Sequence, residues 1–347
     1  MSSSTAEFYH SLPKVELHRH LEGSLRLSTL LEIAREHHLT TPREDHLRSQ
    51  VQITQSDPRS SQNFLSKFEV LREFFRSPEI IVRITEEAIA DAAADNISYM
   101  ELRFTPVALS NAVGFDLGQV MDWVIEGVNK AQTRHTIATR LLVSINRHES
   151  LELAEHIAVE AARRMDSGIV GLDLAGNEAH FPATPFEPVF REAQQSGLMT
   201  TIHAGEWGPA KNVVEAIELF QADRIGHGVR LMEDPEAVAL AREAGTNFEV
   251  CPTSNYQSGV IDDLSQHPIL KMIEAGLNAT IHTDDPGISQ ITLSKEYEGV
   301  CEQIGMSPGI LKERILAAAR AAFLPAEERD LLVASLEHQM GVMTKPD

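Results

Sequence analysis

Short runs rich in β-branched and other apolar residues recur along the whole chain, and longer polar segments separate them. Runs of this length predict buried β-strands, because buried helices need longer apolar patterns. Eight of them are present, at Val15–His20, Tyr99–Thr105, Thr139–Ile145, Ile169–Ala175, Thr200–Ala204, Arg224–His227, Asn247–Cys251 and Asn278–Thr283.

Between these runs lie stretches with the spacing of an amphipathic helix. They include Leu27–His38, Glu79–Asp95, Leu117–Arg134, Leu151–Asp166, Glu187–Ser196, Pro235–Ala244 and Pro268–Ala275. Strands and helices that alternate in this way, joined by right-handed crossovers, predict a parallel sheet covered by helices. Eight such units favour an α/β fold of the (β/α)₈ TIM-barrel type, with extra helices over the C-terminal face of the strands.

An open, doubly wound sheet is the competing architecture. In that fold the first strand should end in a glycine-rich phosphate loop of the G-x-G-x-x-G kind. Here the first strand ends in the segment HRHLEG, residues 18–23. The barrel is therefore preferred.

The chain has no internal repeat, and no linker rich in Pro, Gly or Ser divides it. We therefore expect residues 1–347 to form a single barrel domain. The most irregular stretch is Thr40–Asn63, which is polar and rich in Ser, Gln and Asp. Residues 40–95 are predicted to form a loop and helical lid inserted into the barrel.

The composition is that of a globular protein, with 42% hydrophobic and 5% aromatic residues among 347. The formal net charge is −21, from 51 acidic and 30 basic side chains, and no stretch concentrates Lys and Arg. Because a polymeric nucleic acid requires such a basic surface, it is excluded as a partner. A small ligand with one charge remains compatible with the sequence.

The segment Met1–His10 is polar and Ser-rich, without the apolar core of a signal peptide, and no run of about eighteen apolar residues occurs. We expect no membrane association and a cytoplasmic location. The two cysteines, Cys251 and Cys301, fit a reducing compartment and cannot form a Cys-x-x-Cys zinc site. The sequence does not specify the oligomeric state.

Two histidines, His18 and His20, end the first predicted strand. Alternate side chains of a strand share a face, so these two imidazoles can bind one metal ion. The motif alone is weak, because a chain with 15 histidines places some pairs two residues apart by chance. Support has to come from the other strand ends, where TIM barrels assemble their active sites.

Three further strand ends carry side chains suited to metal binding or acid–base chemistry. They read His203-Ala-Gly-Glu206, Gly226-His227-Gly228 and His282-Thr-Asp284-Asp285. Each motif alone has an ordinary explanation, such as a solvated turn or a helix N-cap. Together, at four predicted strand ends, they indicate a functional site.

Three imidazoles and one carboxylate suit a single Zn²⁺ per chain and leave a coordination position for water. The expected ligands are His18, His20, His203 and Asp284. A zinc-bound water has a pKa of about 7, so hydroxide becomes available at neutral pH. Glu206 is placed to donate a proton to a ring nitrogen of the substrate, and His227 to position or deprotonate the water.

The remaining histidines are not expected among the ligands. His282 shares a face with Asp284, and either lines the pocket or packs behind the ligands. Cys251 is expected to be a buried residue that ends the seventh strand. Six histidines in helical or loop patterns are expected at the surface: His37, His38, His46, His135, His156 and His338.

Motifs of other hydrolase classes are missing from the sequence. It contains no G-x-S-x-G elbow, no G-x-x-x-x-G-K-[ST] phosphate loop and no P-C-x-x-C zinc signature. Amide and phosphoester hydrolases on this barrel often use two metals bridged by a lysine. The end of the fourth strand, Asp173–Gly176, offers no lysine.

Seven ordered motifs together resemble the adenosine deaminase family of the metal-dependent amidohydrolases. They are PKVELHRHLEGSL at Pro13–Leu25, YMELRFTP at Tyr99–Pro106, DLAGNE at Asp173–Glu178, HAGE at His203–Glu206, RIGHG at Arg224–Gly228, CPTSN at Cys251–Asn255 and HTDDPGIS at His282–Ser289. The resemblance spans nearly the whole chain.

The resemblance implies hydrolytic deamination at purine C6 by a zinc-bound hydroxide, with release of ammonia. It gives the four expected ligands to zinc, makes Glu206 the proton donor to purine N1, and lets His227 act on the attacking water. Glu206 must then be protonated in the complex, which burial near other carboxylates favours. The remaining substrate contacts are implied for His20, Glu22, Gly176 and Asp285, with Asp285 at N7 and the Gly176 amide at N3.

One departure bears on the choice of substrate. Adenosine-specific members usually carry Asp, facing the ribose 5′-hydroxyl, where this chain has the longer Glu22, and the adenine-specific branch also tends to carry Glu. Against that, CPTSN and the segment Phe64–Phe68, which resembles a helical lid over a sugar, favour a nucleoside. The expected substrates are adenosine and 2′-deoxyadenosine; the alternatives are adenine, another 6-aminopurine metabolite such as aminodeoxyfutalosine, and a non-catalytic purine-binding protein.

Overall fold

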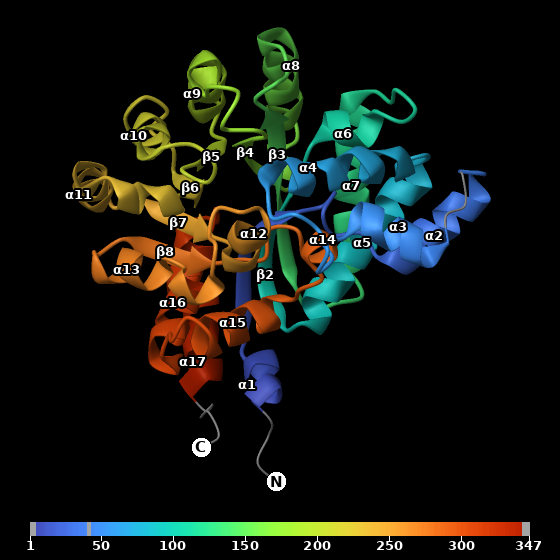
Figure 1. The fold of residues 1–347 in the computed structure, drawn as a ribbon. Coiled ribbons are helices and arrows are strands. Elements are labelled where there is room, and N and C mark those ends of the chain that lie inside the picture. The colour runs from blue at the N-terminus through green and yellow to red at the C-terminus, as the bar shows by residue number, and fades with distance from the viewer. Residues whose placement is uncertain (1–4, 40–42, 342–347) are drawn as a thin grey trace.

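The computed structural model describes residues 5–39 and 43–341. Eight parallel strands form one sheet in sequence order, and helices follow each strand and surround it (Figure 1). The strands are β1 (Lys14–His20), β2 (Ile97–Phe104), β3 (Ala138–Asn146), β4 (Ile169–Ala175), β5 (Met199–Ala204), β6 (Arg224–His227), β7 (Asn247–Val250) and β8 (Asn278–Ile281). The predicted (β/α)₈ TIM barrel is confirmed, and each predicted strand end lies within two residues of the observed one.

The barrel closes where β8 meets β1. The only bridge given for this seam among the described residues joins Arg19 to Asp284. Around it, the amide of His20 donates to the carbonyl of Asp284 and the amide of Asp284 donates to the carbonyl of His18, both at 2.9 Å. The backbone bonds that close the barrel therefore belong to residues of the expected metal site.

The helices that precede β1 or follow β1 to β4 carry the first half of the barrel wall and the segment over its mouth. They are α1 (Thr5–Ser11), α2 (Leu27–Glu36), α3 (Glu44–Val51), α4 (Ser61–Leu71), α5 (Pro78–Ala94), α6 (Pro106–Ser110), α7 (Leu117–Gln132), α8 (Leu151–Ala162) and α9 (Glu187–Gln195). A 3₁₀ turn, η1 (Arg72–Phe74), links α4 to α5.

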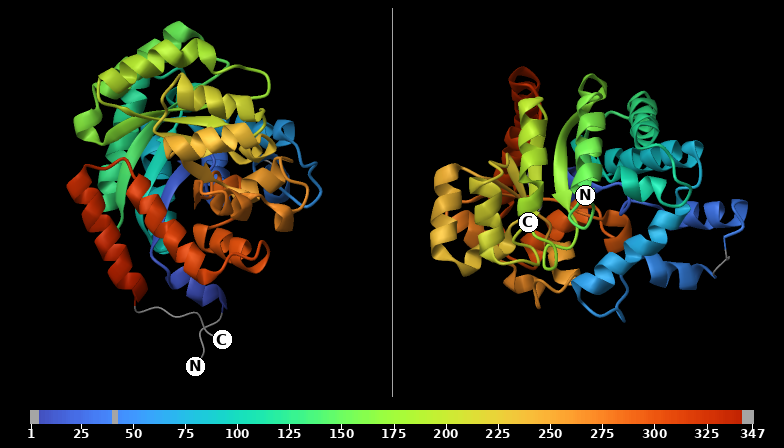
Figure 2. Two further views of the ribbon diagram at one scale, coloured as in Figure 1. Left: turned by 90° about the vertical axis from the view of Figure 1, so that its left-hand side faces the viewer. Right: turned by 90° about the horizontal axis from the view of Figure 1, so that it is seen from above.

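The second half of the chain completes the wall, and its helix α15 packs against α1 (Figure 2). Its helices are α10 (Ala210–Glu218), α11 (Pro235–Ala244), α12 (Pro252–Gln257), α13 (Ile269–Glu274), α14 (Pro286–Ser289), α15 (Leu293–Glu302), α16 (Pro308–Ala321) and α17 (Ala326–Gly341). Each helix in the described part of the chain is too short or too polar to cross a membrane.

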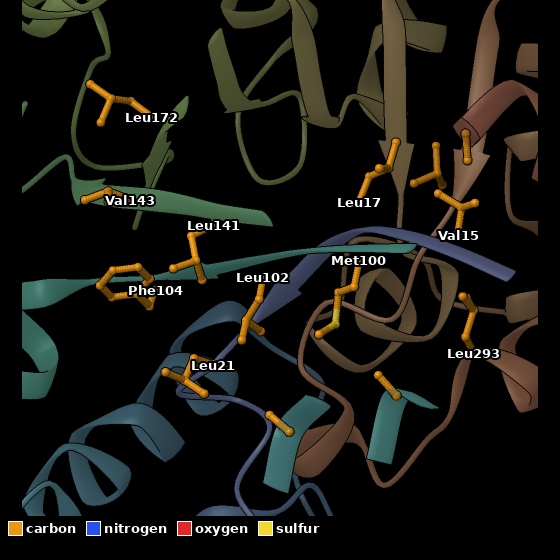
Figure 3. Close-up of a cluster of buried hydrophobic side chains, with 14 of the residues drawn as sticks. Val15, Leu17, Leu21, Met100, Leu102, Phe104, Leu141, Val143, Leu172 and Leu293 are labelled. Atoms are coloured by element: carbon orange, nitrogen blue, oxygen red, sulfur yellow. The ribbon is translucent and has the colours of Figure 1, made fainter. Parts of the chain in front are cut away.

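The outward side chains of the strands form an apolar layer against the surrounding helices. Val15 and Leu17 on β1, with Met100 and Leu102 on β2, are fully buried in this layer (Figure 3). Since side chains alternate along a strand, the intervening residues of β1, Glu16, His18 and His20, point the other way. The polar site is therefore built on the face that the apolar layer leaves free.

The stretch predicted as irregular contains a helix. Residues 40–42 lie outside the described part of the chain, but α3 follows directly, and its Leu47 and Val51, four residues apart, are buried. The polar composition concealed this apolar pair. The extent of the lid, residues 40–95, stays a prediction; its helix α4 lies over the barrel mouth, whereas α5 packs against α7 and β2 in the wall.

Two glycines provide a matched test of this packing. Gly228 has a φ of +70°, and a Cβ there would lie 2.3 Å from the Phe248 ring, whereas Gly299 is helical with no described atom within 4 Å of its Cβ position. We expect Gly228→Ala to lower the free energy of unfolding by about 2 kcal/mol or more. Gly299→Ala should instead raise it by about 0.5–1 kcal/mol. Urea titrations measure both, and equal midpoints for the two variants contradict the argument.

Candidate active site

Four potential metal ligands converge at the C-terminal ends of β1, β5 and β8. They are His18, His20, His203 and Asp284, whose ligand atoms all lie within 4.8 Å of one another. The Oδ1 of Asp284 lies 3.2 Å from His18 Nε2 and 3.3 Å from His20 Nε2. The four residues that the sequence grouped together are thus brought together, and their role as ligands stays a prediction.

Two carboxylates behind the imidazoles set their orientation. His18 Nδ1 lies 2.8 Å from Glu249 Oε2, and His203 Nδ1 lies 2.9 Å from Asp173 Oδ1, with both carboxylates fully buried. An imidazole that gives its Nδ1 proton to a carboxylate turns an unprotonated Nε2 toward the centre. His18 Nε2 is buried without a hydrogen bond in the described residues, an arrangement that fits a metal ion.

The electrostatics of the four residues also fit a cation. Burial lowers the pKa of His203 to about 4, so its imidazole is neutral and able to bind metal. Burial alone would raise the pKa of Asp284, but His18 and His20 hold it well below its usual range. For His20, burial acts in the opposite direction and would lower the pKa, but Asp284 and Asp285 raise it to about 9. A bound divalent cation replaces the proton that His20 otherwise holds among these carboxylates.

His227 is fixed in one tautomer beside the ligands. Asn255 Nδ2 lies 3.1 Å from His227 Nδ1, and His267 Nε2 lies 3.2 Å from Asn255 Oδ1. An amide nitrogen can only donate, so Nδ1 of His227 accepts and its Nε2 carries the proton. That Nε2 lies 3.6 Å from Glu206 Oε2 and 3.9 Å from Asp284 Oδ2.

Glu206 is a buried carboxyl group whose surroundings favour its protonated form. Its side chain is 3% exposed. Burial raises its pKa well above the usual value, and the nearby carboxylates of Asp284, Glu178 and Asp285 raise it further. The surroundings therefore favour the protonated carboxylic acid, the form that proton donation requires.

Glu178 holds the loop that carries Glu206, a role that sequence reasoning missed. Its carboxylate accepts the backbone amides of Gly205, Glu206, Trp207 and Gly208 at 2.6–3.0 Å. It also accepts from Asn212 Nδ2 at 2.8 Å. The motif DLAGNE ends in Glu178, but nothing in its spacing connects that residue to a loop nearly thirty positions later.

The pocket above these groups is enclosed partly by the lid. Its lining comes from the strand ends and from α4, η1 and the loop after β5: His20, Glu22, Phe64, Leu65, Phe68, Arg72, Thr105, Asn146, Ala175, Gly176, His203, Glu206, Trp207, His227, Asp284 and Asp285. Every substrate-binding residue expected from the sequence lines it. The aromatic side chains of α4 cover its mouth, where they can exclude water from a flat ligand.

Two carboxyl oxygens at this pocket have no hydrogen-bond partner among the described residues, Oε2 of Glu22 and Oδ1 of Asp285. The other oxygen of Glu22, Oε1, accepts the amide of Thr105 at 2.7 Å. Gly23 allows the close approach of these segments, since a Cβ there would lie 1.8 Å from Asp285 Oδ1. Unpaired buried oxygens indicate groups that await a ligand.

The remaining histidines and Cys251 lie outside the pocket. His282 is buried beside β1, with its Nε2 2.8 Å from Thr280 Oγ1 and its Nδ1 3.1 Å from the amide of Leu17. It therefore packs beneath the expected ligands and does not line the pocket. Cys251 is buried directly after β7, as predicted. Five of the six histidines expected at the surface are exposed and His135 is half-buried.

Comparison with known proteins agrees with this geometry. The profile of the family "Adenosine deaminase" matches residues 13–339, nearly the whole chain. The chain belongs to the adenosine deaminase family. An adenosine deaminase from Clostridium botulinum (strain Loch Maree / Type A3) is 36% identical over 327 residues, which cover 93% of this chain and 97% of that protein.

Two solved structures of family relatives share the fold over almost their full length. A zinc-bound amidohydrolase from Burkholderia ambifaria superposes with a TM-score of 0.88 at 27% identity, covering 98% of this chain and 94% of that one. The N6-mAMP deaminase of Arabidopsis superposes with a TM-score of 0.87 at 30% identity, covering 96% and 99%. These neighbours therefore share the barrel and its overall dimensions.

The metal centre is testable by its effect on stability. Because a metal that binds only the folded chain stabilises it, zinc added to chelator-treated protein should raise the unfolding temperature, by an increment that grows with zinc concentration. His203→Ala should abolish that increment. The control is His156→Ala, which changes an exposed histidine of α8 and should respond as the unaltered chain does. An equal response of the two variants contradicts the site.

Proposed function

We propose that this protein removes the 6-amino group of adenosine and 2′-deoxyadenosine by hydrolysis, which yields the inosine counterpart and ammonia. The observation that carries the proposal is a buried Glu206 with a raised pKa, beside His227 and four potential metal ligands, in a pocket lined in part by aromatic side chains. Family membership supports the same reaction. We expect it in the cytoplasm and acting on a small nucleoside.

The metal centre would hold one zinc ion through the four converging ligands, His18, His20, His203 and Asp284. When bound there, zinc supplies Lewis-acid activation of water at neutral pH. The chain's own part is to keep His18 and His203 oriented through Glu249 and Asp173. Fixed imidazoles cost no reorganisation during the reaction.

The ring nitrogens of adenine explain the charge states of the pocket. N1, N3 and N7 are all hydrogen-bond acceptors, so recognition requires three donors. Glu206 supplies one, because its raised pKa keeps its proton, and it would deliver that proton to N1. Asp285 supplies another toward N7, since burial and the neighbouring Asp284 raise its pKa well above the usual value. The backbone amide of Gly176, at the end of β4, would serve N3.

Proton delivery to N1 is what makes attack at C6 possible. Addition of water to C6 breaks the conjugation of the ring, and the electrons displaced by that bond need a proton at N1. The Nε2–H of His227, which lies beside Glu206, would hold the attacking water by hydrogen bonding. The amino group then leaves as ammonia when the tetrahedral carbon collapses.

Glu22 would bind the sugar. Its Oε1 is fixed by the Thr105 amide, whereas its Oε2 is buried and unpartnered, which suits a hydrogen bond to a ribose 5′-hydroxyl. A free adenine would leave this oxygen unpaired. Adenine or another 6-aminopurine is the alternative substrate. Because one structural neighbour is an N6-mAMP deaminase, a 5′-phosphorylated nucleoside is included among the compounds to be tested.

Replacement of Glu206 tests the chemistry directly. Glu206→Gln keeps the size of the side chain but cannot deliver a proton, so kcat for adenosine should fall about a thousandfold or more while zinc content stays unchanged. The loss of ultraviolet absorbance of adenosine measures turnover. Glu218→Gln at the end of α10 is the control and should retain full activity. Near-normal turnover by Glu206→Gln rules out its role as the acid.

Replacement of Glu22 tests the substrate. If Glu22 binds a ribose hydroxyl, Glu22→Gln should lower kcat/KM for adenosine by about tenfold to a hundredfold, because a buried hydrogen bond to a charged or acidic group is worth about 1.5–3 kcal/mol. The rate with adenine should change little. The panel is adenosine, 2′-deoxyadenosine, adenosine 5′-monophosphate and adenine, and a preference of the unaltered chain for adenine overturns the nucleoside assignment without affecting the chemistry.

A further inference from the structure

A second cavity lies on the opposite side of β1 from the active site. It encloses about 860 Å³ between α1, the end of α5, α14 and α15. Arg19 lines it from β1, whereas His18 and His20, its neighbours on the strand, face the barrel interior. The two cavities share no lining residue. The second one is therefore separate from the catalytic pocket but has a strand wall in common with it.

Arg19 is the unusual group of this cavity. Its side chain is 5% exposed, and its only hydrogen bond given for the described residues joins Nε to Ser24 Oγ at 3.1 Å. Two more deeply buried arginines, Arg103 and Arg224, each contact two carboxylates, and a third, Arg147, donates to backbone carbonyl groups through its Nη atoms. Arg19 has no carboxylate within 4.0 Å in the described chain. The two Nη groups of Arg19, for which the described residues provide no hydrogen bond, are therefore open to the cavity and available to a ligand.

The acidic residues nearest to Arg19 are already engaged. Glu16 accepts the amide and hydroxyl of Thr283, Asp91 binds Arg26 at 2.6 Å, and Asp95 accepts the amide and hydroxyl of Ser294. None of these carboxylates can turn to the Arg19 fork without giving up these bonds. The Nη groups are thus left for a ligand that enters the cavity.

The remaining lining defines the chemistry of that ligand. Arg26 and Lys295 also carry positive charge, while four carboxyl groups line the cavity and disfavour a highly charged anion: Glu7, Asp91, Asp95 and Glu298. Leu25, Leu27 and Ile291 provide an apolar wall. One anionic group for Arg19 and an apolar body for this wall match the lining.

We propose that this cavity is a second binding site, for a small organic molecule that carries one carboxylate, phosphate or sulfonate group bound by Arg19. The guanidinium fork donates two parallel hydrogen bonds to two oxygens of such a group, the geometry that arginine favours for these anions. The site does not rest on the proposed function, because none of its residues belongs to the catalytic pocket.

The position of the site allows its occupant to affect the active site through segments that the two cavities share in sequence. The cavity is lined by Ser24–Arg26, directly after Glu22, and by Pro286 and Gly287, directly after Asp285. Gly287 N donates to Gly23 O at 2.7 Å, so the two segments move as one unit. Gln52, which follows helix α3, also lines the cavity and donates to Gly287 O at 3.0 Å. An occupant contacts all three segments and should therefore change the rate of the reaction.

Anilinonaphthalene sulfonate, an apolar dye with a single anionic group, is a suitable probe because its fluorescence rises on binding. The unaltered chain should bind it saturably, and inorganic phosphate should compete. Arg19→Met keeps the length of the side chain without its charge and should weaken binding at least tenfold, the loss of about 1.4 kcal/mol or more expected for a charge-assisted bond. Arg320→Met, at an exposed arginine of α16, is the matched control and should bind as the unaltered chain does.

A second variant protects the test against misfolding. Ala94 lines the cavity from the end of α5, so Ala94→Phe, which leaves Arg19 in place, should occupy part of the cavity and weaken dye binding at least tenfold. Normal dye binding by either variant, with an unchanged unfolding temperature, overturns the site. Saturating dye should also alter kcat for adenosine in the unaltered chain and not in Ala94→Phe. An unchanged kcat refutes the proposed effect of the occupant on the active site, whether or not adenosine proves to be the best substrate.

Discussion

One buried carboxylate, Glu249 on β7, connects the barrel interior to the metal centre. It contacts the guanidinium groups of Arg103 and Arg224 and lies 2.8 Å from Nδ1 of His18. Burial alone would raise its pKa, but these three cationic or proton-donating groups hold it well below the usual range. An ionised Glu249 in turn fixes the ring of His18. If this carboxylate were lost, two buried arginines would each lose one of their two counter-charges, and His18 would lose its orientation.

The closure of the barrel depends on the same region. Strands β8 and β1 are joined through the backbone of Asp284, whose φ of +63° is uncommon for a residue other than glycine. That conformation lets one residue bond to β1 on both sides and turn its carboxylate toward His18 and His20. Backbone strain of this kind persists only where surrounding bonds determine it. The backbone bonds of Asp284 that close the barrel therefore also fix the position of its carboxylate beside His18 and His20.

The sequence predicts the strands well because each is a compact apolar run between polar segments, and it predicts the site because ligand-type residues follow those runs. It cannot predict partners that meet through the barrel interior. Glu249 and Asp173 stand inside short apolar strands, where a charged residue signals a buried role but not which histidine it contacts. Helix α3 was missed for the opposite reason, since only Leu47 and Val51 mark its buried side. Pairings across the fold require the register of the strands, which no local pattern contains.

Carboxyl groups at equal depth in this site hold different charges, and the difference follows from their neighbours. Asp284 contacts two imidazoles and stays ionised, as a metal ligand must. For Glu206 and Asp285, burial and the ionised Asp284 raise the pKa well above its usual value, which favours the protonated form that donates a hydrogen bond. A purine, which presents acceptors along its ring, needs those donors. The negative charge of Asp284 therefore attracts the metal and, by the same field, sets the two acids that would bind the base.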